Sequence, residues 1–216
     1  MARSRATFAA VAGLWIAVAG ACSDREADRT PAPVAAAPPA APPAEAAVGE
    51  WNVLLDGTSF DGWQPVGDAS WRVVDGAVLA DSGNGFLVSL EEYGDFELRA
   101  EFWVDAAANS GIFLRASDPQ AITPQNAYEV NVFDARPDPT YRTGAIVDLA
   151  APATRVDTAD RWNTYEIRAD GPHLVVTLNG VVTADLQDTK LARGPIALQS
   201  AGGTVKFRSV QVRALR

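Results

Sequence analysis

The chain has 216 residues, 48% of them hydrophobic, and a formal net charge of −9, which suits one folded domain or at most two small ones. The acidic balance argues against a nucleic-acid partner, because binding phosphates requires a basic surface. One cysteine and one histidine exclude an internal disulfide and a cysteine-based metal cluster, and any Ser–His–Asp triad or His-ligated site would have to use His173.

The first 21 residues are typical of a signal peptide. Two arginines precede an apolar stretch over residues 8–19, which is too short to span a bilayer comfortably. The small residues before Cys22 resemble a bacterial lipobox, in which the thiol is lipidated and becomes the new N-terminus. The alternative is an ordinary signal peptide cut at an A-x-A-like site. We expect a lipid anchor at Cys22 and a periplasm-facing location in the cell envelope, with Ser23 favouring the outer membrane.

Residues 22–49 are dominated by alanine and proline. Such a segment cannot bury a core and is expected to form an extended, semi-stiff tether. We therefore divide the chain into a signal peptide (1–21), a linker (22–49) and one folded domain (50–216).

Within the domain, short β-type runs are separated by Gly, Asn and Asp, and no long segment has a helical period. Residues 71–80 predict a hairpin that turns at Asp75-Gly76. Residues 96–102 alternate strictly, with the apolar side chains on one face. Residues 173–186 predict a second hairpin around Asn179-Gly180, and residues 205–212 alternate with a register change near Arg208 that indicates a β-bulge.

Strands with turn signals continue to the end of the chain. This pattern is typical of an antiparallel sandwich or barrel. The number of strands suits an all-β, two-sheet jelly-roll sandwich better than a seven-strand immunoglobulin sandwich. One sheet of a jelly roll is usually curved, and its concave face would be a natural trough for a sugar.

Three segments place polar side chains inside apolar strands, at residues 109–115, 128–134 and 143–148. In the second segment Glu129 and Asn131 share one face of a regular strand. An acid and an amide are costly to bury unpaired, so they predict an open polar face or a binding site. Asp134 falls on the opposite face, unless a bulge near residues 132–133 brings it back.

Three other residues could belong to the site or to the protein surface. Arg115 closes an apolar run, where it would pair with a carboxylate or with substrate, or extend from a strand end into solvent. Trp103 lies opposite Phe102 and Val104 on its strand and could stack on a sugar ring. His173 follows a Gly-Pro turn, where a surface position is expected.

Several motifs occur in an order that resembles one known family. They are Leu-Leu-Asp-Gly at residues 54–57, Phe-Asp-Gly-Trp at 60–63, Asn-Ser-Gly-Ile-Phe-Leu-Arg at 109–115 and Tyr-Glu-Val-Asn-Val-Phe-Asp at 128–134. Shorter matches follow at residues 143–146, 162–163, 178–180, 194–199 and 207–208. Together they resemble the bacterial 3-keto-disaccharide hydrolase family, over residues 51–215.

The resemblance implies a concanavalin A-like jelly roll that cleaves 3-keto-glycosides. A ketone at C3 acidifies the C2 proton, so a base can remove it and the enolate can expel the oxygen on C1. Glu129 is the expected base, Asp134 the second acid or a metal ligand, and Arg115 a third catalytic residue. The expected substrate-binding residues are Asn109, Ser110, Tyr128, Asn131, Thr143, Gln199 and Trp103. A divalent cation would stabilise the enolate, but no metal ligand set is assigned.

Ala201 departs from the family, since many members carry His at this position. Two other functions therefore stay open: a noncatalytic carbohydrate-binding module, and an envelope lipoprotein that binds another protein. The enzyme hypothesis predicts that Glu129, Asp134 and Arg115 converge in one concave pocket, whereas a protein-binding sandwich predicts an exposed apolar patch.

Overall fold

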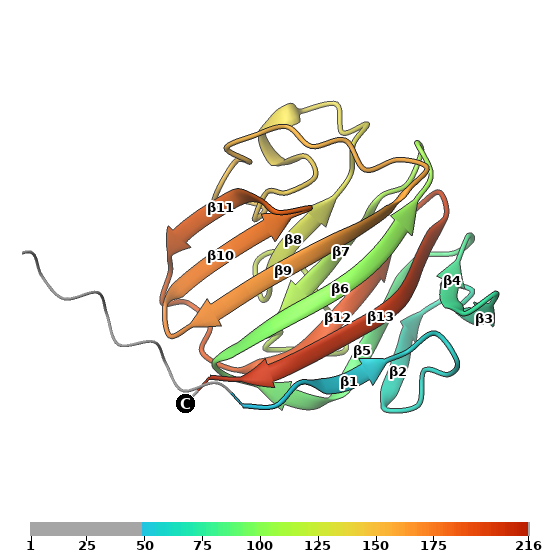
Figure 1. Cartoon of the computed structure of the whole chain (residues 1–216), viewed down its shortest axis with the longest axis horizontal. Helices are drawn as coiled ribbons and strands as arrows, with labels where there is room; N and C mark the ends of the chain where they lie inside the picture. The colour runs from blue at the N-terminus through green and yellow to red at the C-terminus, as the bar shows by residue number, and fades with distance from the viewer. Residues whose placement is uncertain (1–48, 216) are drawn as a thin grey trace, which may run out of the picture. The chain divides into compact units, whose positions relative to one another are not determined.

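A computed structural model describes residues 49–215 (Figure 1). The predicted signal peptide, the predicted lipidation site Cys22 and all but the last residue of the predicted linker lie outside the described residues. Within residues 49–215 the chain forms thirteen β-strands and one short 3-10 helix, η1 (Pro139–Tyr141). No helix in this part is long and apolar enough to cross a membrane.

The larger sheet has eight antiparallel strands in the order β11-β10-β9-β6-β13-β4-β3, and β1 pairs with β13 beside this path. Its strands are β1 (Asn52–Leu55), β3 (Arg72–Val74), β4 (Ala77–Ala80), β6 (Phe96–Val104), β9 (Trp162–Asp170), β10 (His173–Leu178), β11 (Val181–Gln187) and β13 (Val205–Ala214).

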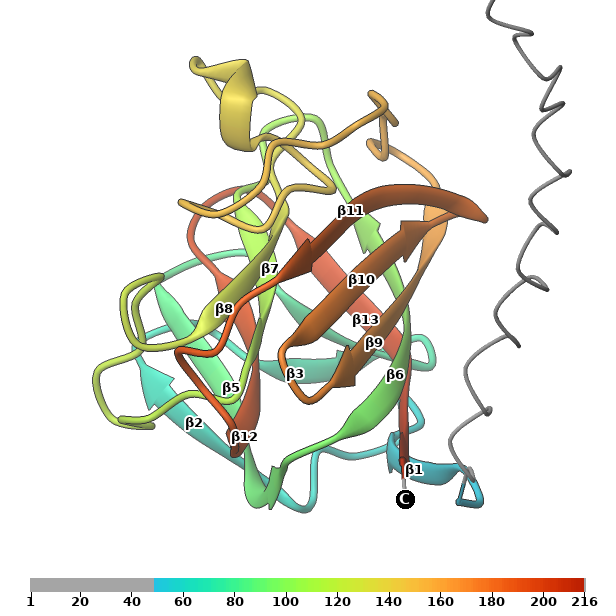
Figure 2. The same cartoon turned by 90° about the vertical axis from the view of Figure 1, so that its left-hand side faces the viewer.

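The smaller sheet has five antiparallel strands in the order β2-β5-β12-β7-β8. They are β2 (Trp63–Gly67), β5 (Gly85–Tyr93), β12 (Gly194–Ser200), β7 (Ser110–Leu114) and β8 (Tyr128–Val132). Figure 2 shows the two sheets as separate layers, with β2, β5, β7 and β8 on the left and β6, β9 and β10 on the right. The expected two-sheet jelly-roll sandwich is confirmed.

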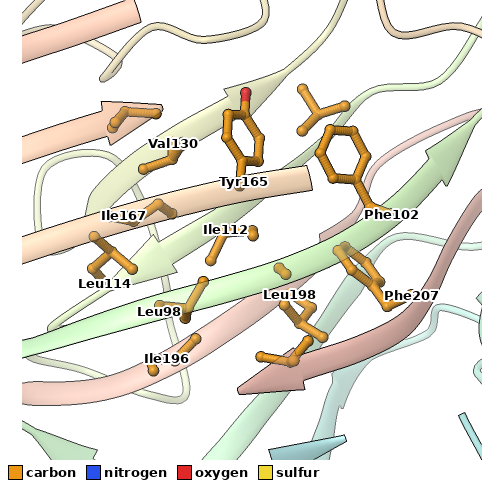
Figure 3. Packing of buried hydrophobic residues seen from close by; sticks show 14 of the residues in the cluster. Leu98, Phe102, Ile112, Leu114, Val130, Tyr165, Ile167, Ile196, Leu198 and Phe207 are labelled. Atoms are coloured by element: carbon orange, nitrogen blue, oxygen red, sulfur yellow. The ribbon is translucent and has the colours of Figure 1, made fainter. Parts of the chain in front are cut away.

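The core lies between the two sheets. In β6 the burial pattern alternates, and Leu98 and Phe102 are fully buried. Figure 3 shows them facing Ile112 of β7 and Leu198 of β12 in the opposite sheet. The Phe102 ring stacks on that of Tyr165, with centroids 5.0 Å apart. Burying each such side chain stabilises the fold by roughly 1.5–3 kcal/mol. This gain explains why the apolar residues of the alternating β6 sequence face the core.

Both predicted hairpins and the predicted bulge are present. Asp75 and Gly76 have φ values of 50° and 74°, and Asn179 and Gly180 have 50° and 80°. Two consecutive residues with positive φ are the requirement of a type I′ turn, whose twist matches that of the flanking strands. The pairing of β13 with β6 changes register between Phe207 and Ser209.

An irregular edge segment follows β8 and runs beside it. Ala145 O accepts a hydrogen bond from Asn131 N at 3.0 Å, and Val147 N donates to Glu129 O at 3.0 Å. Residues 142–147 are buried throughout. The segment predicted at residues 143–148 therefore closes the β8 edge of the five-stranded sheet, although it is not a regular strand.

Candidate functional site

Two rows of side chains cross the outer face of the five-stranded sheet, the face turned away from the core. Cross-strand pairing defines both rows, which run from β2 to β8. The first row consists of Val66, Phe86, Gln199, Gly111 and Asn131. The second row consists of Gln64, Val88, Ala197, Phe113 and Glu129. This face therefore brings together three of the predicted site residues, namely Glu129, Asn131 and Gln199.

Glu129 lies against an aromatic ring in an almost closed environment. Its exposed fraction is 7%. A Cβ placed on Gly111 would lie 3.5 Å from Glu129 Cγ and 3.4 Å from Phe113 Cε2, so both side chains occupy the space left free above this glycine. Burial raises the pKa of Glu129 to about 7, because a low-dielectric site disfavours the charged carboxylate.

Two charged residues outside the strands act on the same carboxyl group. Arg136, in the loop after β8, lowers the pKa of Glu129, and Asp148 raises it. Asp148 has a φ of 65°, an uncommon backbone conformation for a residue other than glycine, and its Oδ2 accepts a hydrogen bond from Gln125 Nε2 at 3.1 Å. The proton affinity of Glu129 is thus set by burial first and by two opposite charges second.

Two amide oxygens on the same face of the sheet as Glu129 have no hydrogen-bond partner in the described part of the chain. They are Asn131 Oδ1 and Gln199 Oε1, and both atoms are buried. Asn131 Nδ2 donates to Tyr141 O at 2.5 Å, which holds the amide in place. Unsatisfied buried acceptors cost about 1–3 kcal/mol each. Since neither oxygen contacts solvent, neighbouring side chains would have to move before a ligand hydroxyl group could donate a hydrogen bond to them.

Arg115 does not converge with Glu129. It is completely buried and donates to the carbonyls of Gly94 at 2.9 Å, Gly171 at 2.8 Å and Leu191 at 3.0 Å. Its Nη2 donates to Asp95 Oδ1 at 3.0 Å. The side chain thus joins three turns at one end of the sandwich, and the expected convergence of Arg115 with Glu129 is not present among the described residues.

Asp134 also lies apart from the candidate base. The chain leaves β8 after Val132, so no bulge of the strand returns Asp134 to the outer face. Its carboxylate accepts hydrogen bonds from Thr143 Oγ1 at 2.6 Å, Thr158 N at 2.5 Å and Ala159 N at 3.1 Å. Among the described residues, no hydrogen bond or ion pair joins Glu129 to Asp134 or Arg115. Asp134 and Thr143 together anchor the loops between β8 and β9.

Three more expected substrate-binding residues lie away from the outer face of the five-stranded sheet. Ser110 Oγ donates to Gln199 O at 2.7 Å and Tyr128 OH to Asp188 Oδ1 at 2.6 Å, and both residues are buried on the core side. Trp103 belongs to the outer face of the larger sheet, where Lys206 Nζ lies 4.5 Å from its ring centroid. These contacts are structural within the sandwich.

Asn109 and Ala201 continue the site beyond the first row. Ala201 N donates to Asn109 O at 2.9 Å, just past the paired ends of β7 and β12. Ala201 is two residues after Gln199, and both are only partly buried. The position at which the family resemblance leads one to expect His therefore adjoins the candidate site, and the side chain there is the methyl group of Ala201.

The aromatic and charged neighbours of Glu129 cannot be recognised from the sequence pattern. Phe86 and Val88 of β5 face outward, whereas Leu87 faces the core, so the strand is apolar on both faces. Such a run indicates a strand covered on both sides, but it does not show which residues line a site. Arg136 lies in a loop, where no periodic signal exists.

Metal binding finds little support in this arrangement. Over residues 49–215 no group of three or more His, Cys, Asp or Glu residues is placed to hold a metal ion. Beside the Glu129 carboxyl group, the two rows offer the amide oxygens of Asn131, Gln199 and Gln64. One carboxyl group with a few amide oxygens is a small ligand set for Ca²⁺, which takes about six to eight oxygen ligands.

Solved structures share this fold at low sequence identity. A candidate glycosyl hydrolase from Parabacteroides distasonis is 23% identical, with a TM-score of 0.67 over 77% of this chain and 100% of that one. A second such structure from the same organism is 18% identical, with a TM-score of 0.68 over 77% and 94%. The carbohydrate-binding module CBM66 from Bacillus subtilis is 19% identical, with a TM-score of 0.56 over 69% and 93%.

No curated protein matches the sequence. The family model of the 3-keto-alpha-glucoside-1,2-lyase-like domain matches residues 50–213, which is nearly the whole described part. The chain therefore belongs to the family of 3-keto-alpha-glucoside-1,2-lyase-like domains.

Proposed function

We propose that this domain cleaves 3-keto-glycosides and that Glu129 is the base that removes the C2 proton. The observation that carries the proposal is a single buried carboxyl group with a pKa of about 7, on the same face of the sheet as two unpartnered amide oxygens. A general base works best when its pKa lies near the working pH. The family assignment supports the same chemistry.

The reaction needs no oxidant and no covalent intermediate. Ionised Glu129 takes the proton from C2, which the C3 ketone acidifies, and the C2–H electron pair forms the enolate. The enolate then forms the C1=C2 double bond as the C1–O bond breaks. The proton on Glu129, or one from water, passes to the departing oxygen. Addition of water across C1=C2 completes a net hydrolysis.

The other residues of this face bind the sugar and stabilise the enolate. Asn131 Oδ1 and Gln199 Oε1 accept hydrogen bonds from sugar hydroxyl groups and so orient the ring over Gly111. Arg136 contributes a positive charge that acts on Glu129 and that would favour the negative enolate. The apolar contact with Phe113 keeps Glu129 desolvated, and a desolvated carboxylate is a stronger base than one in water.

The decisive experiment uses the chain from residue 22 onward, with Cys22→Ser, and a 3-keto-glucoside that carries a chromogenic leaving group. Glu129→Gln keeps the size of the side chain and removes the base, so kcat/KM should fall at least about 100-fold. Glu50→Gln, an exposed change, is the matched control and should leave the rate unaltered.

Two outcomes would count against this function. Activity in Glu129→Gln within a few-fold of wild type would remove Glu129 as the base. A well-folded parent protein that binds the 3-keto-glucoside without releasing the chromophore would be a noncatalytic carbohydrate-binding module. The fold shared with a carbohydrate-binding module and the small side chain of Ala201 favour this second function.

We further propose that the protein acts at the periplasmic face of the cell envelope, anchored through a lipid on Cys22. The signal-peptide pattern and the small residues before the cysteine support this location. Metabolic labelling with a fatty-acid analogue should mark the wild type and not Cys22→Ser. Separating the inner and outer membranes would then place the anchor, and an unlabelled wild type would contradict lipidation.

A further inference from the structure

The outer face of the five-stranded sheet has an apolar half beside the polar one. Phe86 and Phe113 meet edge to face, with centroids 5.2 Å apart and planes at 88°. Phe113 is buried, whereas Phe86 and its neighbour Val66 are only partly buried. Phe86 is adjacent to Gln199 in the first row. An apolar platform therefore begins one strand away from the polar groups.

The loop between β7 and β8 covers part of this face. Ala116, Ile122 and Ala127, from the loop between β7 and β8, pack on the second-row residues Phe113 and Ala197. Figure 2 shows this yellow-green loop on the outer side of the sheet, at the left. Gly111 and Asn131 of the first row are buried as well. The part of the first row that a ligand can contact from solvent is therefore Gln199, Phe86 and Val66, which are partly exposed.

The two ends of the first row differ. At the β8 end, Asn131 Nδ2 donates to Tyr141 O, and the buried edge segment 142–147 runs alongside the strand. At the other end, Gln64 and Gly67 of β2 are exposed, and β2 is an edge strand. A substituent on the bound sugar ring can therefore extend toward Phe86 and Val66, but not past β8.

From this arrangement we infer that Phe86 and Val66 form the subsite for the leaving group, and that the group expelled from C1 is aromatic. This inference rests on the proposed function, because it takes the reacting ring to lie over Gly111 beside Glu129. Phe86 is two strands from Gly111, about 10 Å, and Gln199 lies between them. An aromatic group that is attached to C1 and lies over Gln199 therefore meets the neighbouring Phe86 ring. An aromatic group can stack on the Phe86 ring, which a methyl group cannot do.

The test measures binding without turnover. In a Glu129→Gln background of the chain from residue 22 with Cys22→Ser, calorimetry compares phenyl and methyl 3-keto-glucosides. The phenyl compound should bind at least about tenfold more tightly. Phe86→Ala should weaken its binding about threefold to tenfold, the range expected for one aromatic contact, and leave methyl binding unchanged.

Two variants protect the result against misfolding. Phe86→Tyr keeps the ring and should keep the phenyl preference. Leu90→Ala, on the same strand and 67% exposed, should behave like the parent. Equal affinity for both compounds, absence of binding, or a phenyl preference that survives in Phe86→Ala would overturn the inference.

The outcomes also separate this inference from the proposed function. A phenyl preference that depends on Phe86, without release of the aglycone by the protein with Glu129 restored, would keep the subsite and reject the enzyme. Release of the aglycone without any phenyl preference would keep the enzyme and reject the subsite.

Discussion

Phe113 of β7 and Glu129 of β8 are directly paired across the two strands, and their side chains meet above the hydrogen of Gly111. Glu129 thus lies among apolar neighbours and is 7% exposed. The raised pKa of Glu129 follows from that environment, and so do the predictions below.

Gly111→Ala should impair the site more than the fold. The backbone of Gly111 does not require glycine by its φ angle, but an added Cβ would lie 3.2 Å from Val130 O and close to both side chains above it. We expect a stability loss of about 1 kcal/mol and a tenfold or larger fall in kcat/KM. Chemical denaturation and initial rates measure the two effects, and an unchanged kcat/KM would show that the space above Gly111 is not used.

The pH dependence of kcat/KM should report Glu129 and its two charged neighbours. Since the base must be ionised, the rate should rise with pH and level off above about 7. Arg136→Met removes a positive charge that lowers the pKa of Glu129, so the midpoint should move up. Asp148→Asn removes a negative charge that raises this pKa, so the midpoint should move down. Shifts in the same direction in both variants would contradict this account.

Glu129 should also make the stability of the protein depend on pH. Its carboxyl group has a pKa of about 7 in the folded protein, raised from 4.5. The neutral form is therefore favoured by folding, and its contribution is fully present below pH 4.5 and lost as the pH rises to about 7. The loss is roughly 3 kcal/mol. Urea unfolding at several pH values should show this decline in the wild type, and a smaller one in Glu129→Gln.

Arg115 should matter for folding and not for chemistry. Arg115→Met would leave the carbonyls of Gly94, Gly171 and Leu191 without their donor, and we expect a cost of about 3 kcal/mol or more. Asp95→Asn should cost less, since the Asp95 side chain is 48% exposed. Thermal unfolding measures both. The fraction of Arg115→Met that stays folded at low temperature should have the same midpoint of kcat/KM against pH as the wild type. A changed midpoint would show that Arg115 takes part in the chemistry at Glu129.

The strands follow from local rules that need no tertiary information. Alternation in residues 96–102 decides which side chains of β6 are buried, and Asn179-Gly180 imposes its turn because both residues tolerate positive φ. The same period of two puts Glu129 and Asn131 on one face of β8. For these reasons the sandwich, the hairpins and the candidate base could be predicted from the sequence.

Only the tertiary structure decided what surrounds that base. Arg115 and Asp134 are near Glu129 in sequence, yet their hydrogen-bond partners come from turns and loops far along the chain. Phe86, Gln199 and Gly111 come together because β5, β12 and β7 are neighbours in the sheet. A strand period determines which face a side chain occupies, but strand order and loop packing determine its neighbours, and those are set by burial of the whole core.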